Sequence, residues 1–412
     1  MARTADEMSA PALLLLGLAV TGSAQTASAL YAGLTVSSAA GGPVLGALLD
    51  RAGRPGRLLA GTLAGYAGGL AVIALSLGHF PLTVVVTVAV LAGFLAPSLT
   101  GGWTSRLPDV VEPERLTGGY SLDAGTYSAA ALGGPALAGL VAGLAGAGWA
   151  MAAVTALLLL AVPAAWRLPA RETGRSRENR TASENGTAAP GGAAARAGRA
   201  AGRTVPVTTL AGELRAGFAA ITRTRPLLRI TVCSVVAYLG VGMLVVACPL
   251  LGVTYLGGAD RGALLLSVLA AASLMTNAVL SRWPAALMPD TMFALATGLA
   301  GVAYLGLAIA PGAGWVVAAV AVAGVADGPQ LAAIFAVRHR ETPQRLRGQV
   351  FTTAASLKIT AGAAGAALAG VLAGHGAGQA NSAAHSPVLL LIAAAATQAA
   401  ALAAFAALST RR

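Results

Sequence analysis

The sequence predicts an all-α integral membrane protein with twelve membrane-spanning helices, and three observations support this class. First, 56% of the 412 residues are hydrophobic and only 10% are charged, whereas a soluble domain carries roughly 25% charged residues. Second, apolar runs close to the roughly 20 residues needed to cross the hydrocarbon core of a membrane recur along the chain. Third, most of the arginines lie in short segments between these runs.

The apolar runs predict spans at residues 8–24, 28–49, 58–79, 82–103, 119–144, 147–167, 229–253, 262–281, 291–311, 315–336, 351–373 and 387–408. The first span is short, because a polar patch from Thr21 to Ser28 follows it and Asp6 and Glu7 lie close to its start. Either helix 1 is truncated at its cytoplasmic end, or it starts upstream. In the second case Asp6 and Glu7 would form a pair in a cavity. As the chain is written, we favour a solvated helix end for both residues.

The distribution of arginines predicts how the chain is oriented. The connections after odd-numbered spans are nearly free of Lys and Arg, whereas those after even-numbered spans contain several. The latter include Arg51, Arg54, Arg57, Arg106, Arg115, Arg282, Arg338, Arg340, Arg345 and Arg347. Because cytoplasmic loops carry an excess of Lys and Arg, we expect a multi-pass protein of the cell (plasma or inner) membrane with both termini in the cytoplasm.

The chain divides into an N-terminal six-helix bundle (residues 1–167), a cytoplasmic linker (168–228) and a C-terminal six-helix bundle (229–412). Residues 167–206 are rich in Arg, Ala and Gly and are expected to be disordered. Next, Leu210, Leu214, Phe218 and Ile221 recur at the spacing of an amphipathic helix, predicted to lie on the inner face of the membrane. A weak internal repeat supports two equivalent halves, because residues 134–143 resemble residues 365–374.

Residues 46–57 read G-A-L-L-D-R-A-G-R-P-G-R and break the almost uncharged N-terminal part of the chain. Arginines alone would suffice for an ordinary cytoplasmic loop, but they do not explain a carboxylate and glycines at fixed offsets. The spacing Gly-x-x-x-Asp-Arg-x-Gly-Arg resembles the signature between helices 2 and 3 of the major facilitator superfamily of secondary transporters. The residues that match or flank this signature form a predicted gating loop: Gly46, Asp50, Arg51, Gly53, Arg54 and Arg57.

The resemblance implies two six-helix bundles that rock about a central cavity. It also implies that Asp50 meets the positive N-terminal end of helix 11 and holds the two halves in the outward-open state. The arginines would hold neighbouring carboxylates and lipid phosphate. Helix 5 carries Gly133-Gly134-Pro135-x-x-Ala138-Gly139, similar to an element of the drug-exporting antiporters of this superfamily. Gly134, Pro135 and Gly139 are therefore either a hinge or simply a site of close helix packing.

Polar residues within spans are candidates for a substrate and proton cavity, because each charge there is costly. The resemblance places helices 1, 4, 7 and 10 around the cavity, so Asp327, with Gln330 one turn on, is the first choice for a proton-carrying carboxylate. Lys358, the only lysine, either faces the cavity or extends to the cytoplasmic headgroups. The other candidates are Asp123, which pairs with a cation or caps a helix, Tyr127, and the pair Tyr238 and Asn277, which line a pocket or bond a neighbouring helix.

The sequence therefore predicts a secondary active transporter that exports a small, largely hydrophobic molecule, a drug or secondary metabolite, by alternating access. Protons are the expected coupling ion, and the cavity is expected to be largely apolar with few charges. Proton-coupled members of the superfamily that this chain resembles carry an arginine within helix 4. Residues 88–97 contain none, so a facilitated or differently coupled mechanism stays open. Uptake of a nutrient or facilitated exchange by the same fold is the alternative.

Several other functions are disfavoured by the sequence. The four histidines, His79, His339, His375 and His385, are scattered at span ends and in loops, so we expect no enzyme, no metal site and no cofactor. The net charge of +12 lies in loops between apolar runs and is not accompanied by a nucleic-acid motif, so no nucleic acid is expected as a partner. The expected partners are the small-molecule substrate, protons and the lipid bilayer, and the chain is expected to act as a monomer.

Overall fold

The computed structural model describes residues 1–169, 210–283, 287–376 and 382–410, and these residues are almost entirely helical. Most of the predicted linker, residues 170–209, lies outside the described residues. The amphipathic segment after it forms α10 (Leu210–Arg223), as the spacing of its apolar residues predicts.

The described helices form two groups of six spans, one from each half of the chain. In the first group, several spans are interrupted or bent: α2 is followed directly by α3, and α5 continues into a π-helical turn at Ser98–Gly102. This group comprises α1 (Ala2–Thr21), α2 (Ala24–Val36) with α3 (Ser38–Arg51), α4 (Pro55–Ser76), α5 (Leu82–Gly93), α6 (Leu116–Ala145) and α7 (Ala147–Trp166). The second comprises α11 (Arg225–Leu251), α12 (Ala259–Arg282), α13 (Pro289–Ala308), α14 (Ala313–Glu341), α15 (Arg347–Gly376) and α16 (Ser382–Thr410).

All twelve predicted spans have a helical counterpart among the described residues, but two boundaries differ in a way that matters. α1 begins at Ala2 rather than at residue 8, so Asp6 and Glu7 lie within the helix and not at a solvated end. α14 ends at Glu341 rather than at residue 336, so Arg338 is a helical residue and not part of a connection. Both predictions were wrong, because polar residues ended the apolar run although the helix continues through them.

Ten of the described helical segments are long and apolar enough to cross a membrane. The spans formed by α1 and α15 are not among the ten. These two helices carry Arg3, Asp6 and Glu7, and Lys358, respectively. Charged residues within membrane spans usually face the interior of the bundle, so α1 and α15 are expected to border a polar interior site.

The helix boundaries follow the local sequence. Pro55 and Pro289 occupy the first turns of α4 and α13, where the missing N–H of proline is not needed. At the opposite end of the bundles, Gly22 follows α1 with φ of 64° and its N–H donates to the Leu18 carbonyl, a left-handed cap that favours glycine. Gly146, with φ of 102°, allows the tight reversal between α6 and α7.

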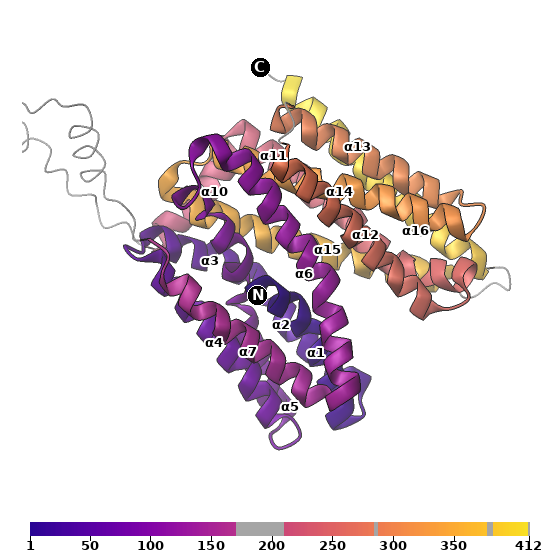
Figure 1. Cartoon of the computed structure of the whole chain (residues 1–412), viewed down its shortest axis with the longest axis horizontal. Helices are drawn as coiled ribbons and strands as arrows, with labels where there is room; N and C mark the ends of the chain where they lie inside the picture. The colour runs from indigo at the N-terminus through magenta and orange to yellow at the C-terminus, as the bar shows by residue number, and fades with distance from the viewer. Residues whose placement is uncertain (170–209, 284–286, 377–381, 411–412) are drawn as a thin grey trace, which may run out of the picture.

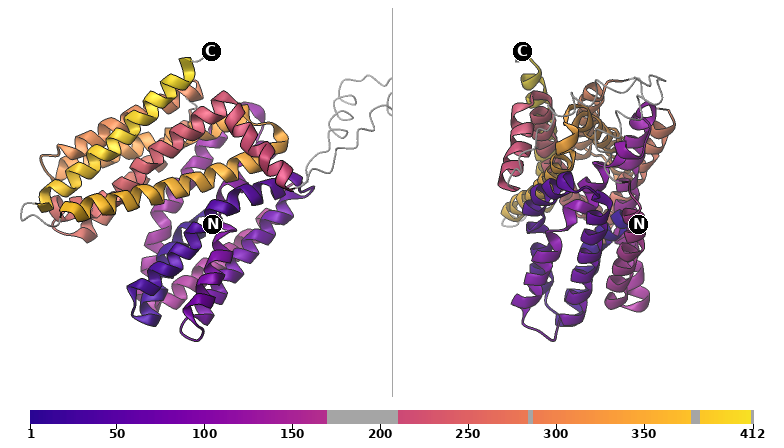
Figure 2. Two further views of the ribbon diagram at one scale, coloured as in Figure 1. Left: turned by 180° about the vertical axis from the view of Figure 1, so that it is seen from behind. Right: turned by 90° about the vertical axis from the view of Figure 1, so that its left-hand side faces the viewer.

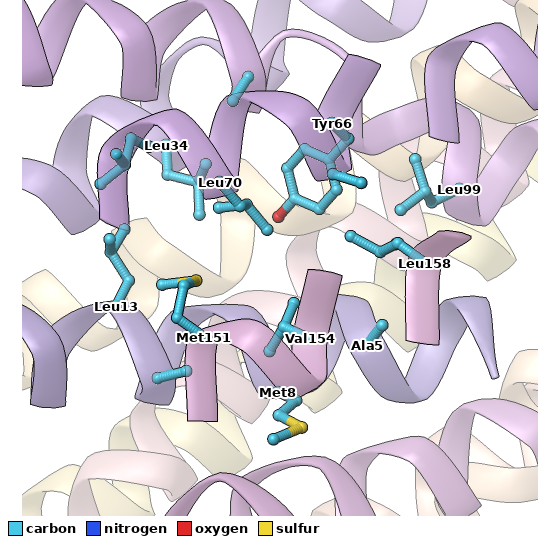
Figure 3. Close-up of a cluster of buried hydrophobic side chains, with 14 of the residues drawn as sticks. Ala5, Met8, Leu13, Leu34, Tyr66, Leu70, Leu99, Met151, Val154 and Leu158 are labelled. Carbon is cyan, nitrogen blue, oxygen red and sulfur yellow. The ribbon is translucent and has the colours of Figure 1, made fainter. Parts of the chain in front are cut away.

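The N-terminal bundle is held together by a large apolar core (Figure 3). Leu13 comes from α1, Tyr66 and Leu70 from α4, and Met151 and Val154 from α7, and all five are almost fully buried. The Tyr66 hydroxyl forms a hydrogen bond of 2.9 Å with the Ser9 hydroxyl of α1. The core therefore anchors the turn of α1 that follows Asp6 and Glu7.

The two bundles touch chiefly through two antiparallel helix pairs, α3 with α15 and α6 with α12. Figures 1 and 2 show that the bundles meet at the end where α3 finishes and α15 begins. Away from this end they diverge, and the first turns of α1 lie near the centre of the molecule. A site between the bundles is thus positioned by α3 and α15 on one side and α6 and α12 on the other.

We predict that Gly93→Ala destabilises the N-terminal bundle. A Cβ atom on Gly93 would lie 1.8 Å from the Leu34 carbonyl oxygen, so α5 would have to move away from α2, and overpacking of this kind costs about 1–3 kcal/mol. Thermal unfolding of the purified protein in detergent should show a lower melting temperature. Gly61→Ala on α4 is the matched control, because nothing lies within 4 Å of its Cβ position and alanine favours helix by about 1 kcal/mol. Equal melting temperatures for the two variants would contradict the close approach of α2 and α5.

Candidate functional site: a cavity between the two bundles

A cavity of about 130 Å³ lies between the two bundles. Its walls come from α1, α6 and the Ser98–Gly102 turn of the first bundle, and from α11, α14 and α15 of the second. The lining residues are Asp6, Glu7, Thr100, Gly101, Tyr127, Ser234, Tyr238, Leu331, Ile334, Phe335, Arg338, Phe351, Ala355, Lys358 and Ile359. Because both bundles contribute, relative motion of the bundles would change the shape of this cavity and its access.

Four of the lining residues have acidic or basic side chains. Asp6 and Glu7 come from α1, whereas Arg338 comes from α14 and Lys358 from α15. The prediction of a cavity with few charges was therefore wrong. The physical reason is that a charged side chain is tolerated in a membrane span when it faces a polar cavity instead of lipid.

Arg338 is positioned by α14. Leu331, Ile334, Phe335 and Arg338 line the cavity at the i, i+3, i+4 and i+7 spacing of one helix face. Arg338 is only 4% exposed, and its Nη2 donates a hydrogen bond of 3.1 Å to the Ser234 hydroxyl of α11. No carboxylate lies within 4.0 Å of its guanidinium among the described residues.

Lys358 faces the cavity, as one of the two interpretations of the sequence proposed. Its ammonium lies 4.5 Å from the ring centroid of Tyr238 and 5.0 Å from that of Tyr127, within the range of cation–π attraction. The charge of Lys358 also interacts with Glu7 and Asp327. Two candidate residues, Tyr127 and Tyr238, thus come together with Lys358 although they belong to different bundles.

Aromatic rings form the apolar part of the wall. The Tyr127 and Phe335 rings lie 5.8 Å apart between their centroids, and the Phe335 and Phe351 rings 6.3 Å apart. Such tilted arrangements are favourable for aromatic pairs. The cavity therefore combines charged groups with a surface suited to an apolar or aromatic body.

Three other candidates do not line this cavity. Asp327 accepts a hydrogen bond of 3.0 Å from Ser273 of α12, Gln330 donates one of 2.8 Å to Thr297 of α13, and Asn277 is fully buried on α12. Sequence pattern alone could not place them, because lone polar residues in a span either face a cavity or bond a neighbouring helix. The structure puts Asp327 and Gln330 in helix–helix contacts of the C-terminal bundle.

Asp123 pairs with a cation instead of capping a helix. Its carboxylate lies 2.6 Å from Nη1 of Arg3, which comes from α1, and it accepts a hydrogen bond of 2.8 Å from Thr104. The Arg3 guanidinium also lies 3.9 Å from the centroid of the Tyr127 ring. This cluster joins α1 to α6 and fixes Tyr127 in the wall of the cavity.

Asp50 of the predicted gating loop forms hydrogen bonds with the other bundle. The Asp50 carboxylate accepts hydrogen bonds of 2.7 Å from the backbone N–H groups of both Gly348 and Gln349, in the first turn of α15. A carboxylate is stabilised at a helix N-terminus by the free N–H groups and the helix dipole. Arg106 lies 3.4 Å from the same carboxylate and is itself buried.

The contact continues along one face of α3. On each helix the contacting residues are spaced four positions apart, which is about one helical turn. Ser356 donates a hydrogen bond of 2.6 Å to the Ser38 carbonyl, and Thr352 one of 2.6 Å to the Gly42 carbonyl. A Cβ atom on Gly46 would lie 2.3 Å from the Gln349 Cα. We call this row, from Ser38 to Asp50 on α3 and from Gly348 to Ser356 on α15, the α3–α15 seam.

The remaining residues of the gating loop lie at the surface. Arg51, Arg54 and Arg57 are exposed, and Arg57 lies over the ring of Trp166, 5.2 Å from its centroid. Nothing lies within 4 Å of the Cβ position of Gly53. Thus Asp50 and Gly46 carry the contact between bundles, whereas the arginines face outward at the same end.

The predicted helix 5 corresponds to α6, and the three residues of its proposed hinge lie in different surroundings. A Cβ atom on Gly134 would lie 2.7 Å from Cβ of Glu7, so this glycine lets α6 approach α1 beside the cavity. Pro135 lies inside the unbroken helix α6, and nothing lies within 4 Å of the Cβ position of Gly139. Of the two interpretations of this element, close helix packing is therefore the one that describes Gly134.

The second contact between bundles, α6 with α12, is made by small and hydroxyl residues. The Ser128 and Ser273 hydroxyls lie 2.8 Å apart, and Ser273 in turn donates to Asp327. A Cβ atom on Gly118 would lie 2.9 Å from the Ser281 carbonyl oxygen. Asp327 is thus linked through Ser273 to the opposite bundle.

Sequence reasoning missed Arg338 as a site residue, and for Asp6 and Glu7 it favoured a solvated helix end over the alternative of a pair in a cavity. A signal was present for each: Ala5, Met8 and Ala12 continue the helical spacing of buried residues through Asp6 and Glu7. For Arg338, the face of α14 defined by Leu331 and Ile334 extends one more turn. Among the described residues, no group of three or more His, Cys, Asp or Glu side chains is placed to hold a metal ion.

Residues 1–370 match the family model described as the Major Facilitator Superfamily. Similar solved structures include the human organic anion transporter MFSD10 (TETRAN), with 14% identity, a TM-score of 0.66, and coverage of 98% of this chain and 97% of that chain. A bacterial homologue of the iron transporter ferroportin in its outward-facing state has 17% identity, a TM-score of 0.70, and coverage of 100% and 98%. The proton:xylose symporter XylE has 13% identity, a TM-score of 0.66, and coverage of 98% and 93%. No curated protein matches the sequence.

We predict that Gly46→Leu opens the α3–α15 seam, because the added side chain would overlap the backbone of Gln349. The measurement is disulfide formation between Ser38→Cys and Ser356→Cys in a protein whose native Cys233 and Cys248 are replaced by serine. Cross-linking should fall severalfold with Gly46→Leu.

Gly53→Leu is the control for this experiment, since its Cβ position faces open space in the same loop. It should leave the cross-linking yield unchanged. A yield that is equally high with Gly46→Leu would show that the seam does not depend on the small residue at position 46.

Proposed function

Because the chain belongs to the major facilitator superfamily, a family of membrane transporters, we propose that it is a secondary active transporter that exports a small amphiphilic molecule by alternating access, in exchange for protons. The observation that carries this proposal is the cavity between the bundles, which brings carboxylates, cations and aromatic rings to one place. The molecule we expect is a drug or secondary metabolite, acting on a monomeric carrier. We place the carrier in the cell membrane with both termini in the cytoplasm, following the distribution of arginines.

We propose that the α3–α15 seam is the cytoplasmic gate. Arg51, Arg54 and Arg57 mark this end as cytoplasmic under the positive-inside rule, and the bundles are joined there and diverge toward the other end (Figure 1). The conformation is then open to the exterior, and Asp50 stabilises it through the first turn of α15. Opening of the seam would give the inward-open state.

We assign the proton-carrying role to Asp6 and Glu7. They lie side by side on α1 and line the cavity, whereas Asp327, the choice made from sequence, is engaged with Ser273 between helices. Exchange requires that the substrate and the proton exclude each other. A substrate group that is positively charged or donates hydrogen bonds would compete with protons for these carboxylates.

Uptake together with protons is the second candidate function, and Arg338 and Lys358 are the observation that favours it. An anionic substrate beside these cations would leave the cavity with excess negative charge unless a carboxylate bound a proton. Anion and proton would then travel in the same direction. The two candidates differ in the sign of the coupling between substrate and proton movement.

We predict that Asp6→Asn and Glu7→Gln each reduce pH-gradient-driven transport at least about tenfold, because an amide cannot carry the proton. The assay uses vesicles containing the purified protein and a panel of labelled amphiphilic compounds under an imposed pH gradient. Movement of a compound against the incoming protons supports export, and movement with them supports uptake. Exchange of labelled for unlabelled compound without a gradient should persist in both variants.

Glu114→Gln serves as the control, because Glu114 is exposed on the surface between α5 and α6. It should leave gradient-driven transport unchanged. Full gradient-driven transport by the Asp6→Asn, Glu7→Gln double variant would exclude these carboxylates as proton carriers.

A further prediction concerns the gate. Asp50→Asn removes the charge from two hydrogen bonds to α15, and hydrogen bonds to charged groups contribute about 1.5–3 kcal/mol. Distances between spin labels on the seam ends of α3 and α15 should therefore show a larger separated population. Glu112→Gln, at an exposed site, should give the same distances as the unmodified protein. An unchanged distribution with Asp50→Asn would refute its role as a latch.

A further inference from the structure

We infer that Arg338 and Lys358 form an anion-binding subsite, and that the transported molecule carries an acidic group, such as a carboxylate or sulfonate, on a small aromatic or apolar body. This inference rests on the proposed transport function and names the chemical class of its substrate. The supporting observation is that two cationic side chains line one cavity and that neither forms an ion pair with a carboxylate among the described residues.

Arg338 provides the first half of the subsite. Its guanidinium has five N–H donors, yet the described contacts supply one hydrogen bond, from Nη2 to the neutral Ser234 hydroxyl. Its Nε is buried without a partner. A buried arginine is normally paired, because an uncompensated charge is costly in a low-dielectric interior. The cavity is therefore the place from which a partner must come.

Lys358 provides the second half, from the neighbouring helix in sequence, α15. The rings of Tyr127 and Tyr238 hold its ammonium by cation–π contacts at 5.0 and 4.5 Å, and these contacts leave its N–H donors available. The carboxylates of Glu7 and Asp327 interact with it only from beyond ion-pair distance. A ligand oxygen can therefore reach Lys358 from the cavity.

The acidic residues of the cavity do not fill the subsite. Asp6 and Glu7 lie on α1 of the other bundle and form no ion pair within 4.0 Å with Arg338 or Lys358. The space between these opposite charges is the cavity itself. An acidic group with two or three oxygens can accept a forked pair of hydrogen bonds from an arginine and one more from a lysine.

The volume and the walls limit the rest of the ligand. An engineered apolar cavity of about 150 Å³ holds one benzene molecule, so a cavity of about 130 Å³ suits a single ring or a body of similar size. Phe335 and Phe351 supply the surface on which such a ring would pack. An acidic group at Arg338 does not prevent another group of the same molecule from competing with protons at Asp6 and Glu7, so the subsite is compatible with either direction of transport.

The test is a binding comparison among three probes that share one phenyl ring, are of similar size and differ in charge: benzenesulfonate, neutral benzenesulfonamide and the cation benzylammonium. Binding to the full-length protein in detergent is measured by saturation-transfer NMR titration. We expect benzenesulfonate to bind at least about tenfold more tightly than either other probe. Arg338→Gln and Lys358→Met should each weaken benzenesulfonate binding about tenfold or more, whereas Arg338→Lys should restore part of it.

Arg215→Gln is the matched control, because Arg215 is exposed on α10, and it should bind benzenesulfonate like the unmodified protein. Thermal unfolding confirms that each variant is folded, and Lys358→Met provides an independent test if Arg338→Gln does not fold. The inference is overturned if benzenesulfonate fails to bind, if the neutral or cationic probe binds as tightly, or if neither cavity substitution weakens binding. Because no gradient is used, selective anion binding without transport in vesicles would refute the proposed function alone, and transport of neutral compounds without selective anion binding would refute the subsite alone.

Discussion

The contact between Asp50 and the first turn of α15 is the interaction on which the arrangement of the two bundles depends. The free N–H groups of Gly348 and Gln349 have no partner within their own helix, and the carboxylate supplies one for both. The buried carboxylate thus accepts a hydrogen bond from each of these two N–H groups. This contact joins residues that are 298 and 299 positions apart in the chain, so it can form only when both bundles are in place.

The rest of the seam follows from the same requirement for close approach. Without a strong hydrophobic force between helices in lipid, association relies on van der Waals contact and hydrogen bonds between helices. Gly42 and Gly46 bring the backbones of α3 and α15 together, and Thr352 and Ser356 bond the carbonyls that this approach exposes. The seam runs from Asp50 to Ser38. The cavity, with its charged walls, lies between the two bundles.

The sequence predicted the number of spans, the division into two halves and the place of Asp50 in a spacing that resembles a family signature, because long apolar runs, loop charges and glycine offsets are local signals. Of the polar residues that line the cavity, it named Lys358, Tyr127 and Tyr238 as candidates, but it did not favour Asp6, Glu7 or Arg338. Asp6 and Glu7 were assigned to a helix end and Arg338 to a loop, since each lies just outside an apolar run. Whether Asp327 or Lys358 reaches the cavity depends on the rotation of α14 and α15 within their bundle, and a single apolar run, rich in alanine, does not determine that rotation.

The two contacts between bundles resemble each other in geometry but differ in chemistry, and this difference bears on how the bundles move. The α3–α15 seam ends in a carboxylate bound to backbone N–H groups, which holds only while the helix end stays within hydrogen-bond distance. The α6–α12 contact uses the Ser128 and Ser273 hydroxyls, which can rotate and exchange partners. Asp290, in the first turn of α13, is bound by Arg229 and Arg340 within its own bundle. The bundles are thus joined by a carboxylate at a helix N-terminus on one side and by hydroxyl groups on the other, and Asp327, bonded to Ser273, lies beside the second contact.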